Sequence, residues 1–500
     1  MPISAESLRL GPWRSGVNYS LPAEDMPPDG IFEMENCTVG LAGEVSKRNG
    51  FAKFNATAMN SGATITACGQ VVLAGTEKVF AFAGNKFFDV TGGTATDRTG
   101  SVTITAGDDY TWDWVLAGNT LIAVNGQDTD GIKWEGGTGN AATLDDSSRF
   151  TKPKWVTFWE NRAWVGNING AADRIWRSDA GDIETWGSLS FYSLGYDITG
   201  LRPFQNYLSI HTEQGIHTLT PTGNSTIPFQ QQQRTQRGTI AGRSIVTVPG
   251  ERQLFVRDDG IYQWSGGASV EKVSFALDDR YWPNLNKARL PYSFALYYPA
   301  QEQVWFFLPY GDSTQTRMNS VVVYSYRLNA WFGPYNGFER DSVALIDDLP
   351  HAGDFAGRIM KHDSGTNDDG NAIKAYFETA SVSPYGDATE CRWLYNRLLY
   401  DNVGAFDMSI SQVAAGIVSN TQTVTMGSAG SVLDSTFVLG TSDLAPDVSA
   451  LTSDTDLFGY DSRSMLRFTN FNLDETFTIR RTNLQYKPIG NVRQRKTGIE

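Results

Sequence analysis

The strongest constraint on the fold is a β-hairpin pattern that recurs along the chain. The clearest copy runs from Trp155 to Trp186, where the runs RAWVG and RIWRS are joined by a loop rich in Gly and Asn. Short runs of β-branched and aromatic residues joined in this way predict two antiparallel strands. The polar residue two places before the first apolar residue of each hairpin serves as a register mark. These marks fall at intervals of 42, 42, 45, 46 and 50 residues, at Glu77, Asn119, Asn161, Asn206, Arg252 and Glu302.

This period indicates a β-propeller of six or seven blades. A repeat of about 40 to 50 residues with several strands per copy is typical of propellers, because one blade alone cannot bury both of its faces. Runs such as KVFAFA and NTLIAV are apolar at successive positions, as expected of inner strands in stacked blades. A weaker seventh copy begins near Gly357. We therefore assign residues 66–380 to one propeller.

The two ends of the chain do not fit the repeat. Residues 1–65 form an N-terminal segment with a loop rich in Pro and Gly, followed by a predicted short helix around Gly30 to Asn36. Residues 381–486 are rich in Ser, Thr, Asp and Val, and their period-two alternation predicts an additional C-terminal β-sandwich-like domain. Residues 487–500 are predicted to form a basic tail. No long stretch has helical periodicity, so the fold class is expected to be all-β.

Charge and hydropathy restrict the possible locations and partners. No run of 18 apolar residues occurs, and the N-terminus lacks the apolar core of a signal peptide, so we expect a soluble protein made in the cytoplasm. The net charge of −14 argues against a surface that grips nucleic acid phosphates. An acidic wall is nevertheless suited to a conduit through which DNA slides without binding.

The residue types that carry metal or redox chemistry lack the required spacing. The cysteines are far apart and form no CxxC pair, so free buried thiols are expected at Cys37, Cys68 and Cys391. No HxxxH or HExxH motif joins the histidines, which are expected to be exposed or at a blade rim: His211, His217, His351 and His362. We predict no metal, no cofactor and no nucleotide site.

Two local patterns were weighed as possible sites. The loop from Asp363 to Asn371 has oxygen ligands at a spacing that suggests calcium, but its sixth and twelfth places hold Asp368 and Lys374. An EF-hand requires Gly and Glu there, so a solvated turn is expected. The run SDAGDIETW, which ends at Trp186, partly resembles the Asp box of sialidase propellers. That box is structural even where it is complete, and we predict no catalytic residues.

The N-terminal segment carries a resemblance to a known family. A segment with the pattern LP, G and EN is followed by a segment with the pattern G, KR and GF, and then by an aromatic propeller. This order resembles the tail tubular protein B, or nozzle, family of short-tailed bacteriophages (podoviruses). The hairpin that ends in SDAGDIETW is similar to one in such phage propellers. The resemblance covers roughly residues 9–380, and its N-terminal matches are Leu21, Pro22, Gly30, Glu35, Asn36, Gly43, Lys47, Arg48, Gly50 and Phe51.

The resemblance implies a structural virion protein without enzymatic activity. Such a subunit would form a homohexameric ring below the head-to-tail adaptor protein and would receive a tail fibre or spike protein. The viral genome would pass through the ring during ejection, as a passenger that is not bound by sequence. The alternatives are a receptor-binding or glycan-degrading, sialidase-like tail propeller, and a general propeller scaffold.

A charge argument gives candidate residues for the wall of the channel. Six copies of this chain carry about −84, and such a wall repels DNA weakly over about 8 to 10 Å at physiological salt. The alternative is that the acidic residues are solvated loop residues of the predicted sandwich. The candidate channel-lining residues are Asp434, Asp443, Asp447, Asp454 and Asp456.

Overall fold

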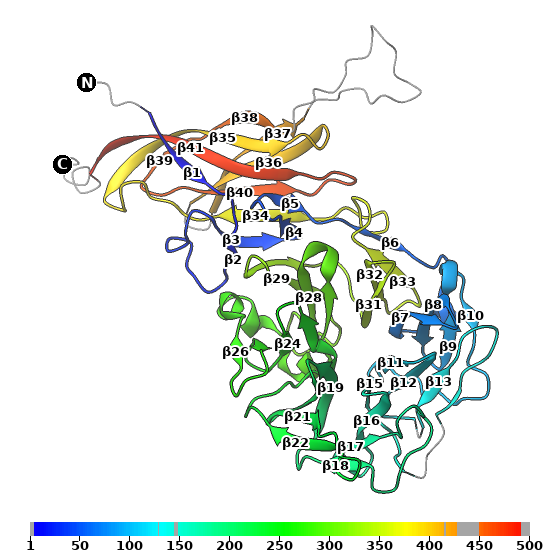
Figure 1. The fold of residues 1–500 in the computed structure, drawn as a ribbon. Coiled ribbons are helices and arrows are strands. Elements are labelled where there is room, and N and C mark those ends of the chain that lie inside the picture. Colours follow the sequence, from blue (N-terminus) through cyan, green and yellow to red (C-terminus); the bar gives the residue numbers. More distant parts are fainter. Residues whose placement is uncertain (1–4, 129, 145–148, 415–416, 428–449, 492–500) are drawn as a thin grey trace.

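The structure is a computed structural model that describes residues 5–128, 130–144, 149–414, 417–427 and 450–491. Among these residues the secondary structure is almost entirely β, which confirms the predicted fold class. No helix in the described part of the chain is long and apolar enough to cross a membrane. Figure 1 shows a ring of small sheets, with two larger sheets packed at one side of it.

The ring consists of seven four-stranded antiparallel sheets, here called blades 1 to 7, and is a β-propeller. Blade 1 contains β7 (Ile65–Leu73), β8 (Thr76–Ala83), β9 (Lys86–Asp89) and β10 (Thr96–Asp97). Blade 2 contains β11 (Asp113–Ala117), β12 (Thr120–Val124), β13 (Ile132–Trp134) and β14 (Ala142–Thr143). Blade 3 contains β15 (Trp155–Trp159), β16 (Arg162–Ile168), β17 (Ala171–Arg177) and β18 (Phe191–Ser193).

The next three blades follow the same order along the chain. Blade 4 contains β19 (Ile198–Phe204), β20 (Tyr207–Thr212), β21 (Gly215–Pro221) and β22 (Phe229–Gln233). Blade 5 contains β23 (Val246–Val248), β24 (Arg252–Val256), β25 (Ile261–Trp264) and β26 (Glu271–Lys272). Blade 6 contains β27 (Phe294–Tyr298), β28 (Gln303–Leu308), β29 (Ser320–Ser325) and β30 (Ala330–Tyr335).

Blade 7 closes the ring with strands from two distant parts of the chain. It contains β31 (Ser342–Ile346), β32 (Leu349–Gly353), β33 (Ile359–His362) and β6 (Phe51–Lys53). Strand β6 pairs antiparallel with β33, and β31 lies beside β7 of blade 1. The seventh copy therefore starts at Ser342 and not near Gly357. Its outer strand comes from the segment 1–65, which the sequence analysis had set apart from the propeller.

The register marks of the repeat lie in the turn between the first and second strands of a blade, or directly after it, in blades 1 to 6; Glu77 and Arg252 already belong to β8 and β24. In blade 3, for example, Glu160 and Asn161 both have positive φ angles, as a type I′ turn between β15 and β16 requires. The second strand of each blade then runs through the interior, and β28 is buried along its whole length. The period therefore followed the turn between the first two strands of each blade.

Two larger sheets, together called the platform, contain strands from both ends of the chain. One has the order β38-β35-β41-β5-β4, with β1 on β41 and β39 on β35. The other has the order β2-β3-β34-β40-β36-β37. The N-terminal strands are β1 (Glu6–Leu10), β2 (Gly16–Val17), β3 (Gly30–Glu35), β4 (Cys37–Val39) and β5 (Val45–Lys47). The others are β34 (Ala375–Thr379), β35 (Thr389–Asp401), β36 (Phe406–Ala414), β37 (Ile417–Met426), β38 (Ala450–Asp456), β39 (Tyr460–Asp461), β40 (Met465–Asn470) and β41 (Thr478–Asn491).

The platform differs in several respects from what the sequence suggested. An additional C-terminal domain is not confirmed, because five strands of the two sheets come from the N-terminal segment. The helix predicted around Gly30 to Asn36 is wrong, since β3 pairs with β34 and this tertiary pairing overrides a weak local signal. Strand β34, placed in the propeller by the sequence analysis, belongs to the platform. Residues 487–491 continue β41, and the rest of the predicted basic tail lies outside the described residues.

Seven short 3-10 helices occur among the described residues, mainly in connections between strands. Three of them, η4 to η6, lie in the connection between blades 5 and 6. Their bounds are η1 (Met59–Gly62), η2 (Thr91–Gly93), η3 (Gly242–Ser244), η4 (Phe275–Leu277), η5 (Trp282–Asn284), η6 (Lys287–Tyr292) and η7 (Pro299–Gln301).

The propeller and the platform share one hydrophobic core. The largest cluster of buried apolar residues extends from blades 5 and 6 into both platform sheets. Within it the Trp13 ring packs edge-on against Phe377 at 5.2 Å between centroids, and Trp331 lies in blade 6 of the same cluster. Domains joined only by a linker move relative to each other by default. The shared core opposes such movement here.

Candidate functional site at the joint between propeller and platform

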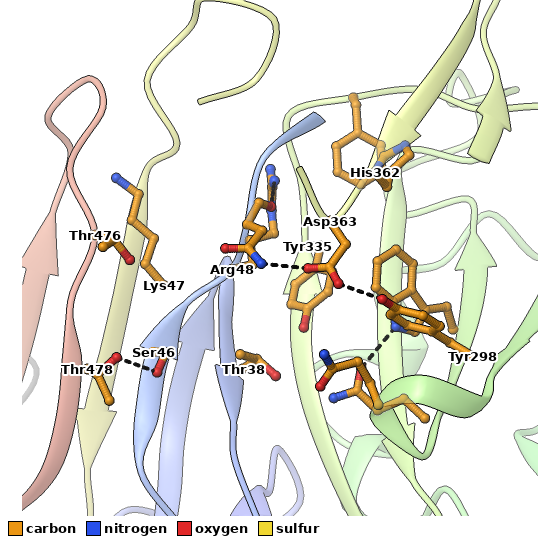
Figure 2. A pocket seen from close by; sticks show the side chains of 15 residues that line it. Thr38, Ser46, Lys47, Arg48, Tyr298, Tyr335, His362, Asp363, Thr476 and Thr478 are labelled. Atoms are coloured by element: carbon orange, nitrogen blue, oxygen red, sulfur yellow. Dashed lines mark hydrogen bonds between the residues drawn. The ribbon is translucent and has the colours of Figure 1, made fainter. Parts of the chain in front are cut away.

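Two chain segments connect the platform to the propeller, and they lie side by side. Residues 48–50 lead from β5 of the platform into β6 of blade 7, and residues 363–374 lead from β33 back into β34. Backbone hydrogen bonds join the two segments, from Gly50 N to the Gly365 carbonyl (2.9 Å) and from Phe51 N to the Asn367 carbonyl (3.1 Å). We call this region the joint. Figure 2 shows the pocket beside it.

Arg48 is the central residue of the joint. Its guanidinium donates to both carboxylate oxygens of Asp368, at 2.9 and 2.6 Å, and the side chains are only 5% and 9% exposed. The remaining N–H groups donate to the Asn36 side chain and to the carbonyls of Asn49 and Asn336. All five donors of the guanidinium are therefore used. A bidentate pair of this kind is the strong, geometrically specific form of a salt bridge.

Asn36 connects three parts of the structure at this point. Its Oδ1 accepts from Arg48 Nε (2.8 Å) and from the Asn336 backbone N–H at the end of blade 6 (2.9 Å). Its Nδ2 donates to the Lys374 carbonyl at 2.8 Å. The residue has a φ of +52°, a left-handed conformation that Asn adopts more readily than most residues. Both the side chain and the backbone conformation favour Asn here.

Gly50 and Phe51 fit the joint for steric reasons. A Cβ atom at Gly50 would lie 1.8 Å from the Asn367 carbonyl oxygen, so no larger residue fits unless the backbone moves. The Phe51 ring packs against Phe338 (5.7 Å between centroids) and against the His362 ring (5.1 Å). The KR.GF run of the sequence therefore has a structural explanation at three of its positions.

A pocket of about 260 Å³ opens beside the joint, with the platform on one side and blades 6 and 7 on the other (Figure 2). On the platform side, Lys47 Nζ donates to Asn470 Oδ1 at 2.8 Å, and burial lowers the pKa of Lys47 to about 8. On the propeller side, Asp363 accepts from the Tyr298 hydroxyl at 2.7 Å. Burial and this carboxylate raise the pKa of Tyr298.

The ionisable groups around the pocket are engaged with protein partners. Burial, and then the charge of Arg340, lower the pKa of His362, whose Nε2 accepts from Arg340 Nε at 3.0 Å. In the described part of the chain, no group of three or more His, Cys, Asp or Glu residues is arranged to hold a metal ion. The contacts at the joint are those of a rigid connection and do not form a nucleophile with a neighbouring base.

The loop from Asp363 to Asn371 is only in part the solvated turn that was expected, because Gly365 and residues 369–371 are exposed but Asp368 is buried. Asp368 is buried against Arg48, and Asp363 accepts from Asn49 Nδ2 and from Tyr298. Asp369 pairs with Lys53 at 2.7 Å. The carboxylates of the loop are thus directed at different cationic and neutral donors and do not converge on one point. The sequence pattern resembled a calcium loop, but its acidic residues pair with the propeller and the connecting segment.

The candidate channel-lining aspartates lie partly outside the described residues. This applies to Asp434, Asp443 and Asp447, while Asp454 and Asp456 lie on β38. Both are exposed and, two residues apart on one strand, point to the same face. Asp454 forms a bidentate pair with Arg397, with both distances 2.8 Å, so this pair adds no net charge to the face. The channel assignment stays a prediction.

The cysteines, the histidines and the Asp-box-like run are all structural parts of the propeller or the platform. All three cysteines are free and buried, as expected. The expectation for the histidines was wrong, because the four side chains are buried inside sheets. The Asp-box-like run forms a turn between β17 and β18, in which the Asp182 side chain accepts from Glu184 N at 2.9 Å and from the Thr185 hydroxyl at 2.8 Å. It is a local structural turn.

The fold and this site define the protein as a seven-bladed β-propeller fused to a platform built from both chain ends. No protein family model matches the chain, and no curated protein matches it. It is similar in structure to the computationally designed protein Ika8, at 12% identity and a TM-score of 0.37, over 62% of this chain and 99% of that one.

Two natural proteins are similar at the level of fold. One is YCF48 from Cyanidioschyzon merolae, at 11% identity and a TM-score of 0.39, over 63% of this chain and 98% of that one. The other is the extracellular domain of the one-component system BT4673 from B. thetaiotaomicron, at 8% identity and a TM-score of 0.45. That match covers 88% of this chain and 63% of the other.

Sequence reasoning identified only half of the joint. The residues Asn36, Arg48, Gly50 and Phe51 were singled out by the family resemblance, whereas Asp368 was noticed only as a misplaced residue in a calcium-like loop. Arg48 and Asp368 are 320 positions apart. Nothing local in either segment indicates that these two residues form an ion pair. The one sequence feature that could have suggested a buried partner is Arg48 itself, which no local pattern explains.

Proposed function

We propose that this protein is a structural subunit of a short-tailed phage tail, which assembles into a nozzle ring below the head-to-tail adaptor. The observation that supports this most is the role of the residues behind the family resemblance. Asn36, Arg48, Gly50 and Phe51 do not surround a reactive group. They build the buried joint that fixes the propeller to the platform.

A nozzle subunit needs this kind of construction. The ring must keep its shape while the genome leaves the capsid, so its parts must not rotate about a flexible linker. The joint supplies a fully hydrogen-bonded guanidinium, and the shared apolar core covers the rest of the contact between platform and propeller. The first and last described strands, β1 and β41, both lie in the platform (Figure 1).

The genome would pass between subunits and not along the axis of a propeller. The cavity at the centre of the propeller has a volume of about 390 Å³ and is crossed by the ion pair between Arg202 and Asp113. A sphere of that volume is about 9 Å across, narrower than the major groove of DNA alone at about 12 Å. The conduit therefore requires several copies arranged around a common axis.

The mass of the assembled particle tests the proposal. Purified protein is examined by native mass spectrometry and negative-stain microscopy, alone and mixed with the adaptor ring, and its copy number is measured in assembled tails. We expect six copies in a ring that is coaxial with the adaptor. A stable monomer or a trimer in purified virions would contradict the nozzle assignment.

A further inference from the structure

The centre of the propeller contains a cavity that the proposed function does not use. It has a volume of about 390 Å³ and is lined by residues at or beside the first strands of all seven blades. Ligand sites in proteins are typically concave spaces of about 300 to 1,000 Å³ with mostly apolar walls and a few placed polar groups. This cavity falls within that size range. Its polar groups therefore decide which kind of ligand it could bind.

One ion pair in the cavity is balanced in charge and satisfied in its hydrogen bonds. Arg202 donates to both oxygens of Asp113, at 3.0 and 3.3 Å, and Asp113 also accepts from the Val156 backbone N–H at 2.9 Å. The pair joins blades 2 and 4 across the ring. Because its charges cancel, it gives the cavity little preference for either sign of ligand.

Arg243 is a second cation in the same wall, and it has no such partner. Among the described residues no carboxylate lies within ion-pair distance of its guanidinium, and only one acceptor, the Asp341 backbone carbonyl, bonds to it (2.6 Å from Nη2). In the described part of the chain, no atom accepts from Nη1. The Phe294 ring covers one side of the guanidinium, at 4.8 Å from its centroid. A largely buried, unpaired positive charge is costly, and an anion would offset that cost.

The nearest carboxylate is not suited to neutralise Arg243. The Asp341 side chain is buried beside Asp108 and Asp109, and burial raises the pKa of Asp341 to about 7. Arg289, the other cation near it, forms an ion pair with Asp109. The charge of Arg243 opposes this rise in the pKa of Asp341, but the two side chains form no ion pair, so the positive charge of Arg243 is only partly compensated in the cavity wall.

The rest of the wall is apolar or neutral. Trp114, Phe158, Phe294 and Ile245 line the cavity, together with the Thr157 side chain. Aromatic side chains around one cationic donor that lacks an ion-pair partner favour a ligand that has an apolar body and a single anionic group. Inorganic phosphate would leave these apolar walls without contacts, and a neutral aromatic molecule would leave the guanidinium unpaired.

We infer that the central cavity of the propeller is a binding site for a small monocarboxylate with an apolar body, held by Arg243. The carboxylate accepts N–H groups of the guanidinium in a charge-assisted hydrogen bond, and the apolar body packs against Trp114 and Phe158. The inference does not depend on the ring proposal, since one isolated chain contains the whole cavity.

Calorimetric titration of the full-length protein tests this inference with defined probes. Sodium benzoate is compared with benzamide, which has the same ring and no charge, and with sodium phosphate. We expect benzoate to bind saturably with one site per chain, and benzamide and phosphate to bind at least tenfold more weakly. Benzamide binding as tightly as benzoate, or no saturable benzoate binding up to about 10 mM, overturns the inference.

Variants assign the binding to the cavity. Arg243→Met keeps most of the side-chain volume and removes the charge, and we expect at least a tenfold loss of benzoate affinity. The matched control is Arg327→Met, which removes an exposed cation of blade 6 that is paired with Glu302, and its benzoate affinity should not change. Unchanged affinity in Arg243→Met overturns the site. If that variant does not fold, the comparison of benzoate with benzamide on the unmodified chain still decides.

Discussion

Replacing Arg48 with Met should destabilise the protein more than any replacement of a surface arginine. The substitution preserves the aliphatic stem and removes five hydrogen bonds, two of them to Asp368, whose side chain is 9% exposed. The carboxylate of Asp368 is then left buried without its cation. Breaking a buried pair from one side costs about 3 to 5 kcal/mol. That is a large share of the roughly 5 to 15 kcal/mol by which a folded domain is stable.

The assay is urea unfolding followed by tryptophan fluorescence, together with limited proteolysis. We expect the free energy of the first unfolding transition to fall by about 3 to 5 kcal/mol. We also expect new cleavage within residues 48–50 or 363–374, because these segments form the joint. The control is Arg327→Met. The Arg327 side chain is 59% exposed in its ion pair with Glu302, so loss of this pair should change the free energy of unfolding by at most about 1 kcal/mol.

A double variant separates the lost contacts from the stranded charge. Arg48→Met combined with Asp368→Asn removes the uncompensated carboxylate, so it should be more stable than Arg48→Met alone. If Arg48→Met unfolds at the same urea concentration as Arg327→Met, the joint does not hold the two parts together. The structural argument for the nozzle assignment would then lose its main support.

Three further changes have expected outcomes. Gly50→Ala should lower the unfolding temperature by several degrees, whereas Gly170→Ala, at an open turn, should lower it less; equal effects would contradict the steric argument. Burial lowers the pKa of His211 to about 4, so its neutral form favours the folded state. Its stability contribution is complete above the unfolded pKa of about 6.5 and is lost as the pH falls towards 4, by about 2 kcal/mol at pH 5. Urea titrations at pH 7 and pH 5 measure this, and His211→Gln should reduce the difference. Burial also raises the pKa of the Cys68 thiol to about 11, so a thiol reagent should label it only after unfolding, and rapid labelling of the folded chain would contradict its burial.

The sequence by itself determined the repeated part of the fold. The alternation of aromatic and polar residues placed the hairpins, and the register marks from Glu77 to Glu302 fell at the start of the second strand, or on the turn before it, in blades 1 to 6. These features are local, because a two-residue turn and a period-two strand are specified by neighbouring residues. The family resemblance of the KR.GF run also singled out Arg48 and Phe51, but it did not indicate which residues they contact.

Only the tertiary structure decided how the ends of the chain are used. The pairing of β6 with β33, the insertion of five N-terminal strands into the platform, and the Arg48–Asp368 pair all join residues about 300 or more positions apart. The predicted helix around Gly30 became a strand for the same reason. Local sequence determines which segments can form strands. Which strands pair with each other depends on the burial of apolar surfaces and charges that only the tertiary structure brings together.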